Sequence, residues 1–149
     1  MWYLRLCDNA FAGEIPDALR NCTALDVAYL NNNNLVGGVP RWLDALLNLT
    51  VLRLSHSSLS GRIPPSLANL TKIVQLEFDQ NLLEGSIPDG LSRLPALRIR
   101  SQNSLTGEIP PGFFNMMSLR GLALANNAFR GELLADVGAR RDQHIPPKF

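Results

Sequence analysis

The chain has 149 residues, of which 46% are apolar, and its 14 basic and 13 acidic side chains leave a formal net charge of +1. This length suits one domain, and a charge so close to zero implies no nucleic-acid partner. No window approaches the roughly 18 apolar residues of a membrane helix, and the N-terminus lacks the basic and apolar regions of a signal peptide.

A short motif recurs along most of the chain at intervals of 22 to 24 residues. Each copy has a glycine with an apolar residue two positions before it and another two positions after it. Five of the six copies then continue with a proline. The glycines are Gly13, Gly37, Gly61, Gly85, Gly107 and Gly131. A period of this size predicts a solenoid in which each copy forms one coil.

Each predicted coil begins with a short strand and a turn. Apolar residues that alternate with polar or small ones, such as Leu52 and Leu54, predict strands with one face inward that stack in parallel. An asparagine follows in five coils, and its amide can both donate and accept hydrogen bonds. These residues are predicted to form a ladder through the core: Asn9, Asn33, Asn81, Asn103 and Asn127. Ser57 replaces asparagine in the third coil and predicts a weaker rung.

The second half of each coil is predicted as another extended segment and a helical turn. Glycine and proline end the extended segment, and apolar residues at i, i+3 and i+6 then suit a short helical or 3₁₀ turn. In the first coil this pattern makes Cys22 a small buried apolar residue. Cys7 is expected on the other side of the coil, so a disulfide is not expected. Trp42 is expected to pack against its neighbours on the convex or lateral side.

The fifth repeat is short, because only 22 residues separate Asn81 from Asn103. Counting back from Asn103 would place two arginines on core positions, which is costly for unpaired charges. Leu97 and Ile99 are therefore predicted to face inward, with a local bulge. The predicted solenoid covers residues 1–138 as six repeats without caps at either end, and residues 139–149 are predicted to be a disordered tail.

The consensus LxxLxLxxNxLxGxIPxxLxxLxx resembles the plant-specific class of extracellular leucine-rich repeats, and its LxGxIP box is the specific part. The segments LSHSSLSGRIPPSLANLT and SQNSLTGEIPPGFFNMMSL resemble the ectodomains of plant receptor-like Ser/Thr kinases of the immune-receptor type. The resemblance implies an α/β repeat solenoid, a right-handed superhelix with a parallel sheet on its concave side and short helical or 3₁₀ turns on its convex side. In such receptors a membrane helix and a kinase domain follow, and this sequence contains neither.

The resemblance also implies a role in recognition, in signal perception or defence, at the extracellular face of the plasma membrane. The expected partners are a peptide, glycan or protein ligand and a co-receptor ectodomain. Outward strand positions would form the binding surface, and Tyr3, Arg5 and Asp8 belong to it. The candidate ligand-binding residues, which include types favoured at hot spots, are Tyr29, Arg53, His56, Gln75, Glu77 and Asp79. The alternative is that they are merely solvated strand faces.

Enzymatic activity, metals and cofactors are not expected. His56 stands between Ser55 and Ser57, but adjacency in sequence is not triad geometry, and the glycines recur as structural elements and not as a phosphate-binding loop. Three glycosylation sequons occur, at Asn21, Asn48 and Asn69. Two alternatives stay open: a soluble polygalacturonase-inhibitor-like or decoy repeat protein, and a truncated, non-functional remnant.

Overall fold

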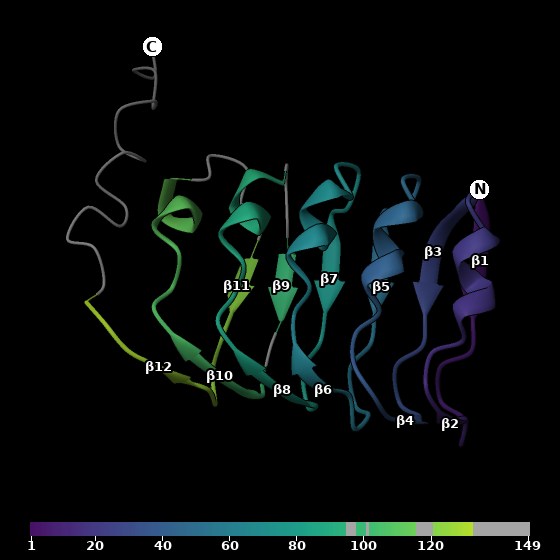
Figure 1. Ribbon diagram of the computed structural model, residues 1–149, viewed down its shortest axis with the longest axis horizontal. Coiled ribbons are helices and arrows are strands. Elements are labelled where there is room, and N and C mark those ends of the chain that lie inside the picture. The colour runs from purple at the N-terminus through teal and green to yellow at the C-terminus, as the bar shows by residue number, and fades with distance from the viewer. Residues whose placement is uncertain (95–97, 101, 116–120, 133–149) are drawn as a thin grey trace, which may run out of the picture.

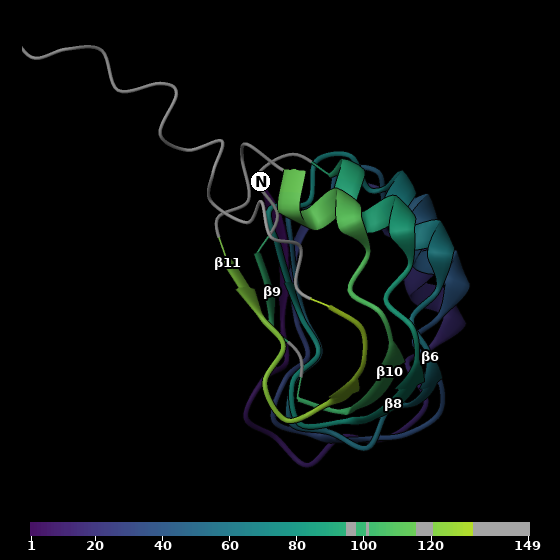
Figure 2. The same cartoon turned by 90° about the vertical axis from the view of Figure 1, so that its left-hand side faces the viewer.

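The computed structural model describes residues 1–94, 98–100, 102–115 and 121–132 (Figure 1). Successive coils stack side by side, so that equivalent segments of each repeat lie next to one another. Viewed from the end, the coils overlie one another as one loop, with strands along two of its sides and helical turns along a third (Figure 2). The predicted tail, residues 139–149, and the end of the predicted solenoid lie outside the described residues.

One strand from each coil contributes to a six-stranded parallel sheet. Its register aligns Leu4, Ala28, Leu52, Leu76, Ile99 and Leu122 in one row. The strands, in their order across the sheet, are β1 (Trp2–Arg5), β3 (Leu25–Tyr29), β5 (Val51–Arg53), β7 (Gln75–Glu77), β9 (Arg98–Arg100) and β11 (Gly121–Ala123). The prediction of parallel, stacked strands is confirmed.

The second extended segment of each coil forms smaller parallel sheets. Four of these segments pair in the order β12-β10-β8-β6, and two more pair separately. Their bounds are β2 (Ala12–Gly13), β4 (Asn34–Leu35), β6 (Ser60–Arg62), β8 (Leu82–Gly85), β10 (Ser104–Gly107) and β12 (Ala128–Phe129). The recurring glycine is required here: Gly85 has φ +76°, and a Cβ on it would lie 3.1 Å from Arg62 Cγ.

Short 3₁₀ helices close the coils, as the spacing of apolar residues predicts. They are η1 (Asp17–Asn21), η2 (Arg41–Ala45), η3 (Pro65–Asn69), η4 (Asp89–Arg93) and η5 (Pro111–Asn115). In the first four, a proline in extended conformation precedes the first helical residue. Among the described residues, no helix is long and apolar enough to cross a membrane.

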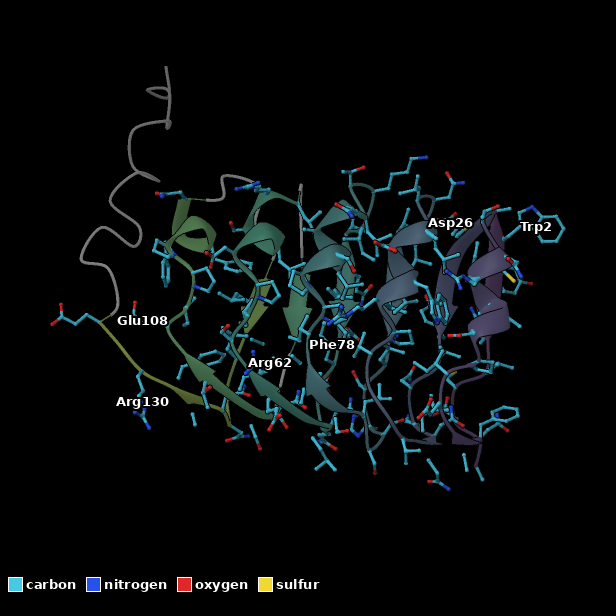
Figure 3. The ribbon with its side chains drawn as sticks, in the orientation of Figure 1. Trp2, Asp26, Arg62, Phe78, Glu108 and Arg130 are labelled. Atoms are coloured by element: carbon cyan, nitrogen blue, oxygen red, sulfur yellow. The ribbon has the colours of Figure 1, made fainter. Side chains whose placement is uncertain are left out.

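The core runs through the middle of the stack, where each coil is covered on both sides. Leu49, Leu52, Leu54 and Phe78 are fully buried. In the first coil, Leu4, Leu6 and Leu19 are only partly buried, and Trp2 projects from the N-terminal end (Figure 3). The prediction that Cys22 is buried is wrong, because this coil has no neighbour on its outer side and Cys22 is exposed. Trp42 is half-buried against the core, as expected.

The asparagine side chains after the strands link adjacent coils through hydrogen bonds. Asn81 Nδ2 donates to the Leu54 carbonyl of the preceding coil (2.8 Å) and to the Phe78 carbonyl of its own (2.8 Å), while its Oδ1 accepts from the Leu59 amide (3.0 Å). Asn33 makes the equivalent bonds one step earlier in the stack. Asn103 and Asn127 also accept bonds from backbone amides, whereas Asn9 only donates, within its own coil.

Ser57 makes a single side-chain hydrogen bond at the ladder position of the third coil. Its hydroxyl donates to the Asn33 carbonyl over 3.3 Å. By analogy with Asn33 and Asn81, an asparagine at this position would accept from the Leu35 amide and donate to the Leu30 carbonyl of the second coil. The third coil therefore has the weakest link to its predecessor among the described rungs.

We expect the substitution Ser57→Asn to stabilise the chain by about 1–2 kcal/mol, because it adds net hydrogen bonds to buried backbone groups. Urea unfolding followed by circular dichroism would measure this as a higher midpoint with an unchanged slope. The neighbouring Ser58 is exposed, so Ser58→Asn is the matched control and should change stability by less than about 0.5 kcal/mol. An unchanged midpoint for Ser57→Asn would refute the weak rung.

In the fifth coil, the strand register is kept although the repeat is two residues short. Ile99 pairs with Leu76 in the sheet. The predicted inward orientation of the Ile99 side chain, and Leu97 as a whole, lie outside what the structure describes. Ile99 comes five positions after Leu94, whereas Leu76 comes six after Leu70. After the strand, Asn103 comes three positions after Arg100, whereas Asn81 comes four after Glu77. One residue is therefore lost on each side of β9.

Candidate ligand-binding face

The six-stranded sheet turns one face away from the core, and we call this the open face. The register aligns Arg5 of β1, Tyr29 of β3, Arg53 of β5 and Glu77 of β7 in one row across it. The Arg53 Cζ lies 4.8 Å from the centroid of the Tyr29 ring, and the Arg5 Cζ lies 5.3 Å from it. Tyr29 is therefore sandwiched between two cations, an arrangement that the ring quadrupole favours.

Glu77 continues this row and is held by its neighbours. Its Oε2 lies 3.3 Å from Arg53 Nε, and its Oε1 accepts a 2.7 Å hydrogen bond from Gln75 Nε2. Only 8% of Glu77 is exposed. Of the candidate residues predicted from sequence, Tyr29, Arg53, Gln75 and Glu77 thus form one connected group on the open face.

The other two candidates, His56 and Asp79, lie in the turns that follow the strands. Asp79 Oδ1 accepts a 2.6 Å hydrogen bond from the Ser55 hydroxyl, and its Oδ2 lies 3.6 Å from His56 Nε2. In a hydrolytic triad the histidine stands between serine and carboxylate, whereas here the carboxylate stands between the other two. His56 also has φ +55°, a left-handed turn conformation that it shares with Asp8, Asn32, Gln80 and Asn126. These contacts therefore link the turn of the third coil, with Ser55 and His56, to the turn of the fourth coil, with Asp79.

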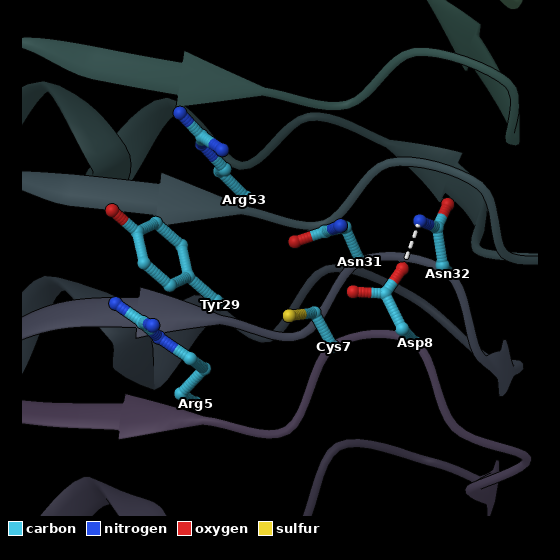
Figure 4. Close-up of a pocket in the computed structure, with 7 residues that line it drawn as sticks. All are labelled: Arg5, Cys7, Asp8, Tyr29, Asn31, Asn32 and Arg53. Atoms are coloured by element: carbon cyan, nitrogen blue, oxygen red, sulfur yellow. Dashed lines mark hydrogen bonds between the residues drawn. The ribbon is translucent and has the colours of Figure 1, made fainter.

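A pocket of about 430 Å³ opens beside the sandwiched tyrosine (Figure 4). The lining residues are Arg5, Cys7, Asp8, Tyr29, Asn31, Asn32 and Arg53. They come from three adjacent coils, at positions that recur 24 residues apart, as in Arg5, Tyr29 and Arg53. Sequence reasoning placed Arg5 and Asp8 on this surface but missed the pocket, although the common spacing is the signal that could have revealed it.

Asp8 organises the far end of this pocket. Its Oδ1 accepts a 2.5 Å hydrogen bond from Asn32 Nδ2. This bond, followed by one from the Cys7 thiol, lowers the pKa of Asp8 below its ordinary value. The pKa of Cys7 is raised above its ordinary value, first by the hydrogen bond of the thiol to Asp8, then by burial, and then by repulsion from the Asp8 carboxylate. Asp8 is therefore ionised in neutral solution, and Cys7 is held as a neutral thiol.

We expect Cys7 to react with iodoacetamide more slowly than Cys22 at pH 8, because a raised thiol pKa leaves less thiolate at a given pH. The substitution Asp8→Asn removes the carboxylate and suits the left-handed turn, where φ is +61°. It should speed alkylation of Cys7 severalfold and leave exposed Cys22 unchanged. Mass spectrometry of each cysteine over time would measure both rates. Equal acceleration of both cysteines, or none, would contradict this account.

The sequon asparagines lie on the surface, outside the strands of the six-stranded sheet. Asn21 and Asn69 end the 3₁₀ helices η1 and η3 and are exposed. Asn48 is exposed too, but its Nδ2 donates to the Thr23 carbonyl (3.0 Å) and its Oδ1 accepts from Lys72 Nζ (2.7 Å).

No metal-binding group is found in the part of the chain that the structure describes. There, three or more His, Cys, Asp or Glu side chains nowhere come together in a way that could hold an ion. The arrangement on the open face instead offers cations, an aromatic ring and amides to a ligand, which are groups that act in non-covalent binding.

Residues 48–70 match the Leucine Rich Repeat family. Among curated proteins, no sequence matches the chain. Solved structures do: the BIR2 ectodomain from Arabidopsis thaliana superimposes with a TM-score of 0.79 at 36% identity, over 88% of this chain and 70% of that one. The ectodomain of the plant membrane receptor kinase GASSHO1/SCHENGEN3 from Arabidopsis thaliana, in complex with CASPARIAN STRIP INTEGRITY FACTOR 2, has a TM-score of 0.88 and 34% identity, over 93% of this chain.

A third similar structure is the ectodomain of the Arabidopsis receptor kinase HAESA in complex with an IDA peptide hormone ligand. It has a TM-score of 0.81 and 32% identity, over 89% of this chain. The chain spans 17% of the length of the GASSHO1/SCHENGEN3 ectodomain and 22% of that of HAESA. It therefore corresponds to a few coils of these much longer solenoids.

Proposed function

The chain belongs to the leucine-rich-repeat family, in the class that forms plant receptor ectodomains, and on that premise we propose that its open face recognises an extracellular peptide or protein ligand. The observation that supports this most directly is the connected row of Arg5, Tyr29, Arg53 and Glu77. Arginine and tyrosine are favoured at binding hot spots, and here their side chains are already held in place by one another.

The similar structures support a peptide as the ligand class. HAESA is bound to a peptide hormone ligand, and RGFR1, a plant peptide hormone receptor, is in complex with RGF2. Parallel strands at a spacing of about 4.8 Å present one outward side chain each per row, which suits an extended ligand that crosses several coils. We propose signal perception as the role of such binding, and defence as the kind of signalling.

We further propose that the protein acts at the extracellular face of the plasma membrane, with a co-receptor ectodomain as a second partner. Glycosylation at Asn21, Asn48 and Asn69 would accompany this location. Their exposed positions on the coil surface support the proposal, because glycosylation requires a sequon at the surface.

Selection of random peptides displayed on phage against the full chain tests the function. We expect enriched peptides whose affinity falls at least tenfold in Tyr29→Ala and in Arg53→Ala, as is typical of hot-spot residues. Arg41, which is exposed in η2, gives the matched control, and Arg41→Ala should leave the affinity within twofold. Peptides that bind Tyr29→Ala as tightly as the parent chain, or that lose affinity in Arg41→Ala instead, would overturn the open face as the binding surface.

A further inference from the structure

The Arg5, Tyr29 and Arg53 side chains form a cationic site that the chain neutralises only in part. Arg53 has Glu77 as its partner, 3.3 Å away. Within the described residues, the Arg5 side chain forms no ion pair and donates no hydrogen bond; its partners are the rings of Tyr29, 5.3 Å away, and Tyr3, 5.9 Å away. Two positive charges thus flank one ring with a single carboxylate beside them.

The geometry holds these groups ready to donate hydrogen bonds. Aromatic contacts hold the faces of both guanidinium groups. Arg5 is exposed and can offer its N–H groups to a ligand, whereas Arg53 Nε is buried beside Glu77, so Arg53 can offer only its terminal N–H groups. Figure 4 shows the guanidinium groups of Arg5 and Arg53 on either side of the Tyr29 ring, with the tyrosine hydroxyl between them. A carboxylate placed beside the hydroxyl could accept a bond from it and from one guanidinium group, while the other, on the opposite face of the ring, adds positive charge. The contacts that already hold these side chains keep the cost in side-chain ordering small.

We propose that the Arg5, Tyr29 and Arg53 site binds the carboxylate of an acidic side chain within an extended peptide ligand. Charge-assisted bonds from arginine to a carboxylate are among the strongest hydrogen bonds in proteins. The inference rests on the proposed function and names the chemistry of one subsite on the open face.

The residues around the site favour a side chain over the end of a ligand chain. On one side along the strands lies exposed Tyr3 with half-buried Val51, and on the other lies the half-buried amide of Asn31. Because the proposed ligand crosses several coils, its backbone runs between these two sets and continues past the site toward the fourth coil, which suits a side-chain carboxylate better than the end of a chain.

The nearby acidic residues do not occupy the site. Glu77 is engaged by Arg53 and Gln75. Asp8 lines the far end of the pocket, where its carboxylate accepts a bond from Asn32, and Figure 4 shows Cys7 and Asn31 between it and the guanidinium groups. These carboxylates would repel a second acidic group of the ligand, so the site takes one carboxylate at a time.

The test uses the full chain and capped peptides of the form acetyl-Gly-Ser-X-Ser-Gly-amide, where X is glutamate, glutamine or lysine. Binding would be followed by the NMR signals of the arginine Nε–H groups. We expect the glutamate peptide to bind at least tenfold more tightly than the glutamine peptide, and the lysine peptide to bind weakest. Arg5→Gln and Arg53→Gln should each reduce the preference for glutamate at least fivefold, whereas Arg41→Gln should leave it within twofold.

Three outcomes would overturn the proposal. Equal binding of the glutamate and glutamine peptides, or no binding of either, would exclude a carboxylate subsite; peptides selected from the random library could still bind the open face, so the proposed function would stand or fall separately. A glutamine peptide with a free C-terminus that binds more tightly than the capped glutamate peptide would instead assign the site to a terminal carboxylate. An unchanged thermal melt of both arginine variants would show that any loss is not due to unfolding.

Discussion

Asn81→Ala is expected to lower the free energy of unfolding by about 2–4 kcal/mol, because it leaves buried backbone groups without hydrogen bonds. The Leu54 carbonyl and the Leu59 amide would lose the bonds that Asn81 gives them, whereas the Phe78 carbonyl would keep the one from Asn103. Urea unfolding followed by circular dichroism would measure the change.

Asn9→Ala is the matched control for this substitution. Asn9 is exposed, and its amide donates only to the carbonyls of Leu6 and Cys7 in its own coil. Because water can replace these bonds, the cost should stay below about 1 kcal/mol. If the two substitutions cost the same, the ladder would not be what joins the coils.

Phe78→Ala is expected to have the largest effect, a loss of about 3–5 kcal/mol, because it opens a cavity in the middle of the stack. Phe78 is fully buried and lies in the middle of the stack of coils (Figure 3). Leu54 occupies the equivalent position in the preceding coil, so Phe78→Leu should cost less than about 1.5 kcal/mol. Calorimetry of the three chains would rank them by melting temperature.

Phe11→Ala removes the same atoms from a surface position and serves as the control. Phe11 is 48% exposed, so its truncation should cost less than about 1 kcal/mol. A broad melt is expected for all these chains, because the partly exposed first coil can unfold before the centre. A Phe78→Ala chain that melted with Phe11→Ala would show that the core is not continuous through the fourth coil.

The repeat pattern predicted most of the fold because each of its residue types has one structural role. Glycine at the positive-φ position, proline before each 3₁₀ helix and leucine on the inner row each act locally, so the sequence spacing alone places them. Cys22 shows where this reasoning fails. Its position in the repeat predicts burial, but burial also depends on a neighbouring coil that covers it, and the pattern of one coil does not contain that information.

The open face could be predicted only as a set of positions. Periodicity identifies Tyr29 and Arg53 as outward residues, but which partners they choose depends on side-chain geometry between coils. The sandwich of Tyr29 by two arginines and the link from Asp79 to both Ser55 and His56 are contacts of this kind. The left-handed backbone at His56 was not predicted either, because the residue type at this turn position varies between coils: the others have Asp8, Asn32, Gln80 and Asn126.

The fifth coil shows that a repeat can become shorter while its strand keeps the register of the sheet. One residue is missing before β9 and one after it, yet Arg98, Ile99 and Arg100 stay in step with Gln75, Leu76 and Glu77. Neighbouring strands of the sheet lie about 4.8 Å apart, and the strand pairing is kept although the segments before and after β9 are each one residue shorter. A ligand stretched across the coils would meet evenly spaced side chains. The specificity of the open face for a ligand sequence could therefore change through single substitutions while the spacing of the contacts stays constant.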